Sequence, residues 1–246
     1  MVCTTCSGAD EKAGRIACDP ANFSLRLVPW VGVAAMLSTN GEPSVKISGR
    51  SFCFLPLPSE TGLPVHVNGY FELSSNRRDI WRGDDMAGEG RIRAEWNRAL
   101  LEDVVAPTYA RMIFRLSKSP YSSDHDWYYH QWPSVEALAE PWASLARRFY
   151  AETARLPVLF STVGGGRWVS PEQARYLADE SEYCEDVRAV LLAEGEAAVK
   201  IPDALPKGFL LAKKPICNIS PQWVRAFCKN VQKIENLKGN RPRTIR

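Results

Sequence analysis

The sequence predicts a mixed α/β protein, with a mixed sheet and helices in its first half and mostly helices in its second. Apolar and polar residues alternate between positions 65 and 73, which is typical of a half-buried strand. Apolar residues then recur every four positions from Ile92 to Val104, which indicates an amphipathic helix. The 246 residues are 45% hydrophobic and 24% charged, so they indicate a globular protein and exclude disorder and coiled coil.

The first part of the chain predicts strands. Residues 1–20 are small and polar and predict a loose leader. Residues 23–37 are mostly apolar, and we expect a buried strand there followed by a short helix. Residues 45–57 form the next candidate strand, which must end or lie at a sheet edge because Pro56 and Pro58 cannot donate to a ladder.

The alternating segment predicts a strand with two different faces, and together with residues 45–57 it predicts a hairpin around the turn SETG. One face holds Val65, Val67, Phe71 and Leu73. The other face holds His66, Asn68, Tyr70 and Glu72. His66 has no obvious carboxylate partner, so we interpret it as an exposed strand residue rather than a general base.

Helical spacing follows the loop RGDDMAGEG, with apolar positions at Ile92, Trp96, Leu100 and Val104. Pro107 should kink or end this helix because it lacks an N–H group. A second periodic segment continues with Tyr109, Met112, Ile113 and Leu116. The aromatic stretch that comes next is expected to be a connection.

The second half predicts helices around one short strand pair. We expect a helix over residues 135–154, a strand over 158–162, and a glycine turn that leads to Trp168 and Val169. Further helices are expected over residues 171–178, 184–193 and 221–234. Ser170 and Ser220 precede the first and the last of these, each followed by proline, as N-cap residues often are.

These patterns divide the chain into four parts. They are a loose leader (1–20), a mixed α/β segment (21–120), a mainly helical segment with a short strand pair (121–230) and a basic tail (231–246).

The net charge of +3 is concentrated at the C-terminus, where residues 229–246 hold six basic residues and one acidic residue. The rest of the chain is slightly acidic, which argues against a nucleic-acid partner. The longest apolar run has 11 residues, too few to span a bilayer, and the first residues lack the apolar region of a secretory signal. We therefore expect no membrane partner and a location in the cytoplasm, with the nucleus as a second possibility.

Motifs for metal or nucleotide chemistry are absent. The sequence contains no phosphate-binding loop, dinucleotide fingerprint, nucleophile elbow or HExxH pattern. Asp124, His125, Asp126 and His130 are four potential ligands within seven residues, but they lack the paired spacing of a closed metal site. We expect no metal there and interpret the segment as a surface loop packed by its aromatic residues.

The segment SSNRRDIW predicts a corner between a strand and a helix. Asn76 is a good N-cap residue and Asp79 stands three positions later, as in a capping box. Arg77 and Arg78 would then lie in the first helical turn and oppose the helix dipole, at a cost of about 0.3–1 kcal/mol each. Either a carboxylate of Glu72, Asp84 or Asp85 pairs with them, or they hold an anion at the helix start.

Several long strings in the chain resemble the sacsin family, particularly its plant members. They are LVPWVGVAAML, GRSFCFLPLPSETGLPVHVNGYFELSSNRRDIW, GDDMAGEGRIRAEWNRALLEDVVAPTYARM, EPWASLARRFYAETARLPVLFSTVGGGRWVSPEQA and ISPQWVRAFCKN. The resemblance covers about residues 23–230 and is dense between 49 and 110.

This resemblance implies a chaperone or co-chaperone function. Sacsin-type proteins are very large intracellular proteins whose repeats each begin with an ATP-binding domain like that of heat-shock protein 90. The present segment resembles the part that directly follows, which implies a middle-type fold, an upstream ATPase domain, and partners that are client proteins or heat-shock-protein-70-type chaperones. ATP with Mg²⁺ would be bound in the adjoining domain, and the chain itself would hold no cofactor.

The resemblance also implies a role for one arginine. In that chaperone class the middle domain supplies an arginine to the γ-phosphate of ATP, within a pattern resembling LPLNVSRE. ELSSNRRDIW is similar, and Arg78 falls on that arginine, with Arg77 as the near alternative and Asn76 beside them. The chain would not be an enzyme and would at most contribute this arginine.

Two hypotheses follow. The first is a non-enzymatic chaperone segment of a longer sacsin-like protein, which contacts clients or partners and supplies Arg78 to ATP hydrolysis. The second is a free-standing protein-binding scaffold without an ATPase partner, or else a non-functional gene fragment. The scaffold's contact patch would consist of exposed aromatic residues, namely Trp127, Tyr128, Tyr129 and Trp132.

Overall fold

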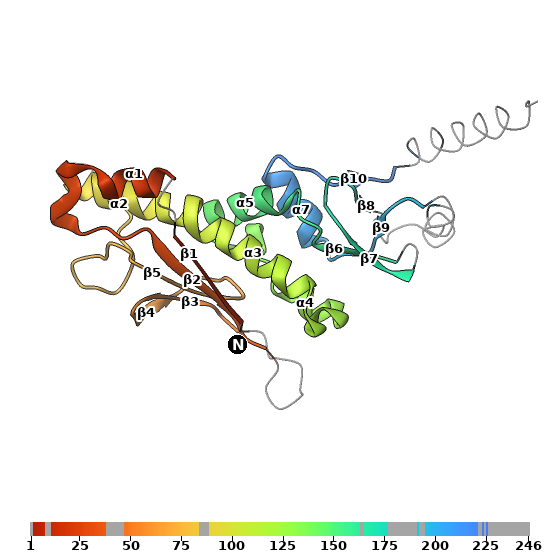
Figure 1. The fold of residues 1–246 in the computed structure, drawn as a ribbon, viewed down its shortest axis with the longest axis horizontal. Coiled ribbons are helices and arrows are strands. Elements are labelled where there is room, and N and C mark those ends of the chain that lie inside the picture. Colours follow the sequence, from red (N-terminus) through yellow and green to blue (C-terminus); the bar gives the residue numbers. More distant parts are fainter. Residues whose placement is uncertain are drawn as a thin grey trace, which may run out of the picture.

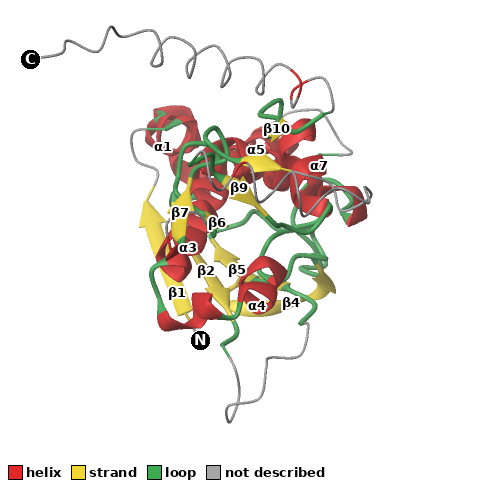
Figure 2. Cartoon of the chain, turned by 90° about the vertical axis from the view of Figure 1, so that its right-hand side faces the viewer, coloured by secondary structure: helices red, strands yellow, loops and turns green. Residues whose placement is uncertain are grey.

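The computed structural model describes residues 2–7, 11–37, 47–83, 89–162, 165–176, 191, 195–220, 223 and 225. Within them the chain forms two five-stranded mixed sheets and a set of helices, so the predicted mixed α/β class is confirmed. The first sheet lies below a long helical stretch that leads toward the second sheet (Figure 1). Viewed from the end, strands β1, β2, β4 and β5 lie low, and helices α1, α5 and α7 lie above them (Figure 2).

The first sheet has the strand order β1-β2-β5-β3-β4. Only the pair β3–β5 is parallel. The strands are β1 (Val2–Ser7), β2 (Trp30–Ala35), β3 (Arg50–Cys53), β4 (Leu55–Glu60) and β5 (His66–Gly69).

The hairpin lies elsewhere than predicted. The chain reverses at Phe54, whose φ of 62° is in the left-handed region, so the predicted strand over 45–57 is divided into the hairpin β3–β4. The alternating segment supplies β5, which lies between β2 and β3 and does not pair with β4. The edge prediction is confirmed, because β4 with Pro56 and Pro58 is the last strand of the sheet.

The first 20 residues are not a loose leader. β1 pairs antiparallel with β2 along its whole length, and helix α1 (Lys12–Cys18) and the 3-10 helix η1 (Pro20–Leu25) follow. Over residues 23–37 the helical turn therefore precedes the strand, which reverses the predicted order. The composition of this small, polar segment does not predict a strand. The strand forms because its backbone pairs with β2.

The helix predicted from Ile92 continues past Pro107 without ending. Helix α2 (Glu89–Ala99) passes into the π-helical segment η2 (Leu100–Val105) and then into α3 (Ala106–Ser117), as Figure 1 shows. The Ala106 N–H donates to the Leu101 carbonyl five residues back, so the bonding pattern widens just before the proline that cannot donate. The predicted kink is therefore a π-helical insertion.

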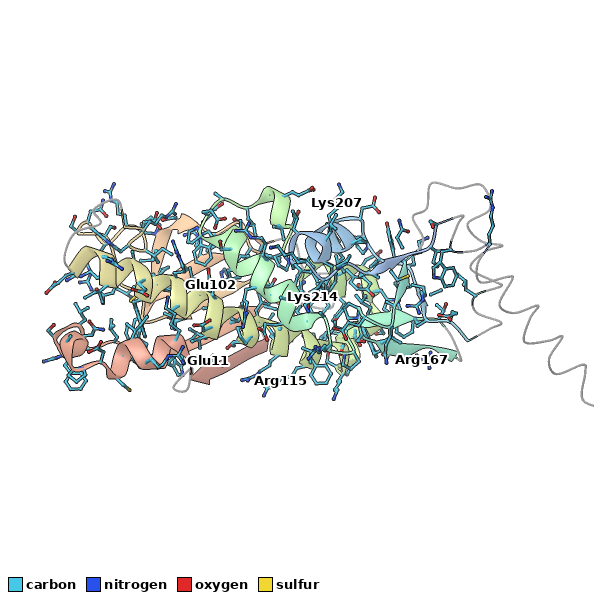
Figure 3. All side chains as sticks on the ribbon, turned by 90° about the horizontal axis from the view of Figure 1, so that it is seen from above. Glu11, Glu102, Arg115, Arg167, Lys207 and Lys214 are labelled. Atoms are coloured by element: carbon cyan, nitrogen blue, oxygen red, sulfur yellow. The ribbon has the colours of Figure 1, made fainter. Side chains whose placement is uncertain are left out.

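The helical stretch packs on one face of the first sheet. Both α3 and η2 contact β2, and the β2 residues Val31 and Val33 are fully buried. Ile92 is half-buried, and the other helical positions that the sequence pattern marks as apolar are buried, namely Trp96, Leu100, Val104, Tyr109, Met112, Ile113 and Leu116. Charged side chains such as Glu102 and Lys207 lie over the helical layer seen from above (Figure 3).

The aromatic stretch is a helix rather than a connection. It follows the 3-10 helix η3 (Pro120–Ser123) and forms α4 (His125–His130), which begins where the carboxylate of Asp124 accepts from the Trp127 N–H at 3.0 Å. The helix predicted over 135–154 is shorter than expected. It consists of the 3-10 helix η4 (Val135–Ala137) and α5 (Trp142–Thr153), with Pro141 at the start of α5.

The second half contains more strand than predicted. Its sheet has the order β10-β8-β9-β6-β7, and helix α7 (Ala204–Leu211) packs against α5 and η4. The predicted pair is present as β6 (Leu159–Ser161) and β7 (Arg167–Val169). The other strands have two residues each, too few for a periodic signal: β8 (Arg175–Tyr176), β9 (Ala198–Val199) and β10 (Cys217–Asn218).

The remaining helix predictions have different outcomes. Residues 171–176 form a turn and then β8, so the helix predicted from residue 171 is wrong there. Most of the helices predicted over 184–193 and 221–234, and the tail over 231–246, lie outside the described residues. The Ser220 Oγ accepts from the Trp223 N–H at 3.2 Å, as expected for an N-cap. Among the described helices none is long and apolar enough to cross a membrane.

We predict that Gly208→Ala destabilises the protein although alanine favours helices. A Cβ atom at position 208 of α7 would lie 2.3 Å from Cζ of Tyr150, whose hydroxyl donates to the Pro133 carbonyl and holds the ring in place. We expect a loss of about 1–3 kcal/mol in the free energy of unfolding, measured in urea. In the Tyr150→Leu background the loss should shrink; an equal loss in both backgrounds would contradict this contact.

A second prediction concerns His66 and pH. Burial, followed by the charge of Arg50, lowers the pKa of His66 from its ordinary value of 6.5, and the Nδ1 atom accepts from the Arg50 N–H at 3.1 Å. The unfolded state therefore binds the proton more readily, so this contribution to stability is present above pH 6.5 and decreases as the pH falls below it. Compared with His66→Gln, the native chain should lose more stability between about pH 7.5 and about pH 5.5 in urea unfolding. Equal losses would refute the assignment.

Candidate functional site

The arginine-bearing segment forms a tight turn, here called the arginine turn (residues 72–82), and not the predicted corner between a strand and a helix. An isolated bridge pairs Leu73 with Ile80 at its base. The Oδ1 atom of Asn76 accepts from the Arg78 N–H at 3.0 Å, which closes a local turn and does not cap a helix. Arg77 has a φ of 55°, so it cannot be part of a right-handed helical turn. The dipole conflict expected for two arginines at a helix start therefore does not arise.

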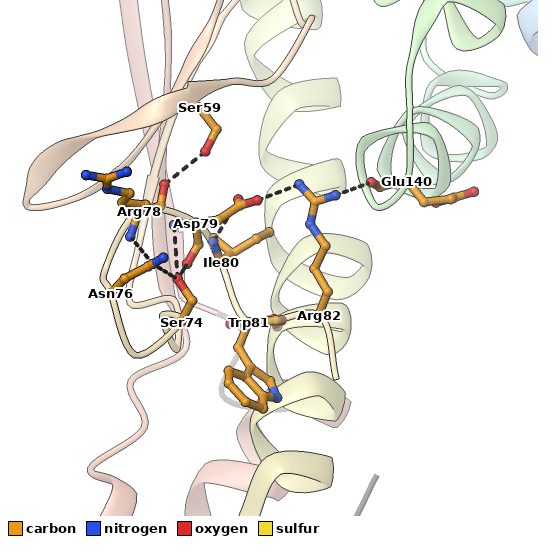
Figure 4. A network of polar contacts seen from close by, with 10 residues as sticks. Ser59, Ser74, Asn76, Arg78, Asp79, Ile80, Trp81, Arg82 and Glu140 are labelled. Atoms are coloured by element: carbon orange, nitrogen blue, oxygen red, sulfur yellow. Dashed lines mark hydrogen bonds and ion pairs between the residues drawn. The ribbon is translucent and has the colours of Figure 1, made fainter. Parts of the chain in front are cut away.

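Hydroxyl groups fix the shape of the arginine turn (Figure 4). Oγ of Ser74 accepts from the Asp79 N–H at 3.2 Å and lies 2.8 Å from Oδ1 of Asn76. Oγ of Ser59, on edge strand β4, donates to the Arg78 carbonyl at 2.9 Å. Hydrogen bonds from within the turn and from the sheet thus hold the backbone around Arg77 and Arg78.

The side chain of Arg82 joins the arginine turn to the residues just before α5. Arg82 pairs with the Asp79 carboxylate at 2.9 Å and donates to the Glu140 carbonyl at 3.2 Å (Figure 4). Asp79 is therefore a partner of Arg82 and not the predicted capping-box residue. Burial raises the pKa of Glu140, but hydrogen bonds from Arg147 at 2.6 Å and from Ser144 outweigh it and lower the pKa below its ordinary value.

Asn97 is the buried anchor that the sequence pattern did not single out. Its Nδ2 donates to the Glu72 carbonyl at 2.8 Å and to the Trp81 carbonyl at 2.9 Å, and its Oδ1 accepts from the Glu72 N–H at 2.9 Å. One side chain of α2 therefore satisfies backbone groups on both arms of the arginine turn. Asn97 is 3% exposed, and a buried amide indicates such an anchoring role. The sequence alone does not reveal this burial.

Arg77 and Arg78 are exposed and form no ion pair with any residue that the structure describes. The predicted partner Glu72 instead pairs with Arg93 at 3.5 Å, and burial raises its pKa against the effect of that arginine. The other predicted partners, Asp84 and Asp85, lie outside the described residues. In Figure 4 the guanidinium of Arg78 points away from the Asp79–Arg82 pair. Both guanidinium groups are therefore accessible to an anion from outside the chain.

The predicted aromatic contact patch is wrong because its residues are buried. Trp127, Tyr128, Tyr129 and Trp132 are all 7% exposed or less. The Tyr128 hydroxyl donates to the Val158 carbonyl at 2.9 Å, and that of Tyr129 accepts from the Phe160 N–H at 3.0 Å. Burial raises the pKa of Tyr129 to about 12. These contacts join α4 to the second sheet, so the rings belong to the core.

The potential metal ligands around α4 make other contacts. Asp124 caps the helix and His125 stacks on Phe160 with ring centroids 4.2 Å apart. Within the described ranges, no group of three or more His, Cys, Asp or Glu side chains is arranged to hold a metal ion.

The fold and the arginine turn define a mixed α/β protein that presents two arginine side chains on a braced loop. A stretch of 97 residues, 39% of the chain, is 44% identical to human sacsin. Together with the ordered motifs in the sequence, this identity supports membership of the chain in the sacsin family. The chain spans 2% of the length of that protein. No family model and no solved structure matches the chain.

We predict that Asn97→Ala loosens the arginine turn and destabilises the protein. Buried backbone groups of Glu72 and Trp81 would lose their partner, at a cost of about 2–3 kcal/mol in the free energy of unfolding. Arg98→Ala, at the adjacent exposed position, should change it by less than about 0.5 kcal/mol. Similar urea midpoints for the two variants would be inconsistent with the anchoring role.

Proposed function

We propose that this chain is a non-enzymatic, chaperone-class segment of a sacsin-like protein, and that its arginine turn contacts ATP bound by an ATPase domain that precedes it. The identity with sacsin supports the family part of the proposal. The observation that carries the mechanistic part is a pair of exposed arginines without an acidic partner among the described residues.

The geometry suits a guanidinium that acts on a phosphate outside the chain. Arg78 is held by its backbone at both ends, by Asn76 at its N–H and by Ser59 at its carbonyl, while its side chain stays exposed. Because the loop is ordered beforehand, little backbone entropy is lost when the side chain meets an anion. A guanidinium placed at the γ-phosphate stabilises the charge that spreads over the transferring oxygens.

The adjoining domain would bind ATP with Mg²⁺, and the present chain would contribute a positioned cation. Arg77 is the near alternative to Arg78. Burial raises the pKa of the Cys53 thiol, while a hydrogen bond with the Phe71 backbone and the charge of Arg77 oppose that rise, so Arg77 acts on a group of strand β3. We assign the phosphate contact to Arg78, which the resemblance to the chaperone pattern aligns with the arginine that contacts ATP.

Contact with client proteins or heat-shock-protein-70-type chaperones needs an exposed apolar surface, and the hairpin β3–β4 supplies one. Phe54 and Leu55 at its tip are 68% and 75% exposed. Phe54 stacks edge-on against Tyr70 with centroids 4.9 Å apart, so the tip is held in place. A free-standing scaffold would use the same surface. The mass of the mature protein separates the two proposals, because a product much larger than 27.5 kDa favours the chaperone segment.

The decisive variant is Arg78→Ala in a longer sacsin-like chain that includes the ATP-binding domain. We expect kcat for ATP hydrolysis to fall at least about tenfold with little change in KM for ATP, because the contact forms with charge in the transition state.

Arg91→Ala, which removes an exposed arginine from α2, is the matched control and should leave turnover unchanged. Loss of activity with Arg77→Ala but not with Arg78→Ala would move the role to the neighbouring arginine. Unchanged turnover in both variants would refute the ATP part of the proposal.

A further inference from the structure

A cavity of about 700 Å³ lies beside α4, away from the arginine turn, and is here called the α4 cavity. One wall comes from α4 and the residues around it. The facing walls come from the end of β2, the loop after β4 and the start of α7, which contribute Met36, Pro64 and Leu205.

The charged groups at this cavity are acidic. Asp124, Asp126 and His130 line it, and the last two are four residues apart on one face of α4. Neither aspartate forms an ion pair with a described residue, and no lysine or arginine is among the described lining residues. Two carboxylates that have no counter-ion among the described residues, beside apolar walls, make the cavity complementary to a positively charged group.

The remaining walls suit the stem of a long cationic side chain. Met36, Pro64 and Leu205 are apolar, and Trp127 and Tyr129 contribute aromatic rings. Lysine and arginine bury their aliphatic stems on such surfaces while the charged end stays near carboxylates. A cation over an aromatic face is attracted to the ring in addition.

A second observation specifies the class of ligand. Trp127 lines the cavity and is 7% exposed, and its indole N–H has no acceptor among the described residues. A buried donor without a partner is unfavourable, so an incoming acceptor that reached it would be favoured. A polyamine or a metal ion supplies positive charge but no acceptor. A peptide supplies both, through its side chain and its backbone carbonyl groups.

We propose that the α4 cavity binds an arginine or lysine side chain of an extended basic peptide segment from a protein partner. The carboxylates of Asp124 and Asp126 take the charged end, and the apolar walls take the stem. None of the residues that line the cavity belongs to the arginine turn, so the proposal does not depend on the proposed contact with ATP.

The probe is the peptide acetyl-Ala-Leu-Arg-Leu-Ala-amide, measured by calorimetry against the full chain. The matched peptide with citrulline in place of arginine keeps the shape and loses the charge. We expect the arginine peptide to bind at least about fivefold more tightly, with a difference that shrinks as salt is added. Equal binding of the two peptides would overturn the proposal.

The matched variants are Asp126→Asn and Asp19→Asn. Asp126 lines the cavity, whereas Asp19 is an exposed aspartate at the start of η1 that does not. The first should weaken the arginine peptide about fivefold and the second should not, with circular dichroism as the check on folding. An identical affinity for both variants would place the peptide elsewhere on the surface.

One further arm tests whether the chain's own basic tail is the occupant. It uses the full chain with glutamine at the six basic positions Lys229, Lys233, Lys238, Arg241, Arg243 and Arg246. Binding of the arginine peptide by the native chain, unchanged in this variant, supports an external partner. Binding that appears only in the variant would assign the cavity to the tail and overturn the proposal.

Discussion

Helix α2 and the arginine turn are joined by the three hydrogen bonds of the Asn97 side chain, and the geometry of the turn depends on them. The backbone groups they satisfy lie on both arms of the turn, at Glu72 and Trp81. Because these groups are partly buried, water cannot replace the amide at low cost. The turn is therefore a rigid extension of the helix, which holds the backbone of an exposed arginine in place although its side chain has no ion-pair partner among the described residues.

The rigidity extends beyond α2. Arg82 links the arginine turn to Glu140, and Arg147 and Ser144 hold the Glu140 carboxylate at the start of α5. The arginine turn is therefore connected to two helices and, through Ser59, to the edge strand of the first sheet. Exposed ion pairs contribute little to stability, so we regard this chain of contacts as a means of positioning. That arrangement suits a segment that must present a cation to a neighbouring domain.

Helix α4 combines two chemical roles within six residues. Its aromatic side chains enter the core and bind backbone groups near the second sheet, whereas Asp126 and His130 remain on the cavity side. Burial of Trp127 and Tyr128 removes the contact surface that a purely sequence-based interpretation favours. The same packing places the carboxylates of Asp124 and Asp126 beside the apolar walls of the α4 cavity. This arrangement discriminates between ligands by charge, which an exposed patch of aromatic rings does not.

The sequence by itself determined the fold class, the apolar positions of the long helix, the edge location of the proline-containing strand and the family. Each depends on local periodicity, on proline chemistry or on an ordered string of motifs, which are properties of the chain alone. Only the tertiary structure decided that β1 joins the sheet, that Asn76 closes a turn instead of capping a helix, and that Asn97 and Arg82 brace it. Those outcomes depend on partners distant in sequence, because a short strand or a polar side chain gains its energy from the group it meets after folding.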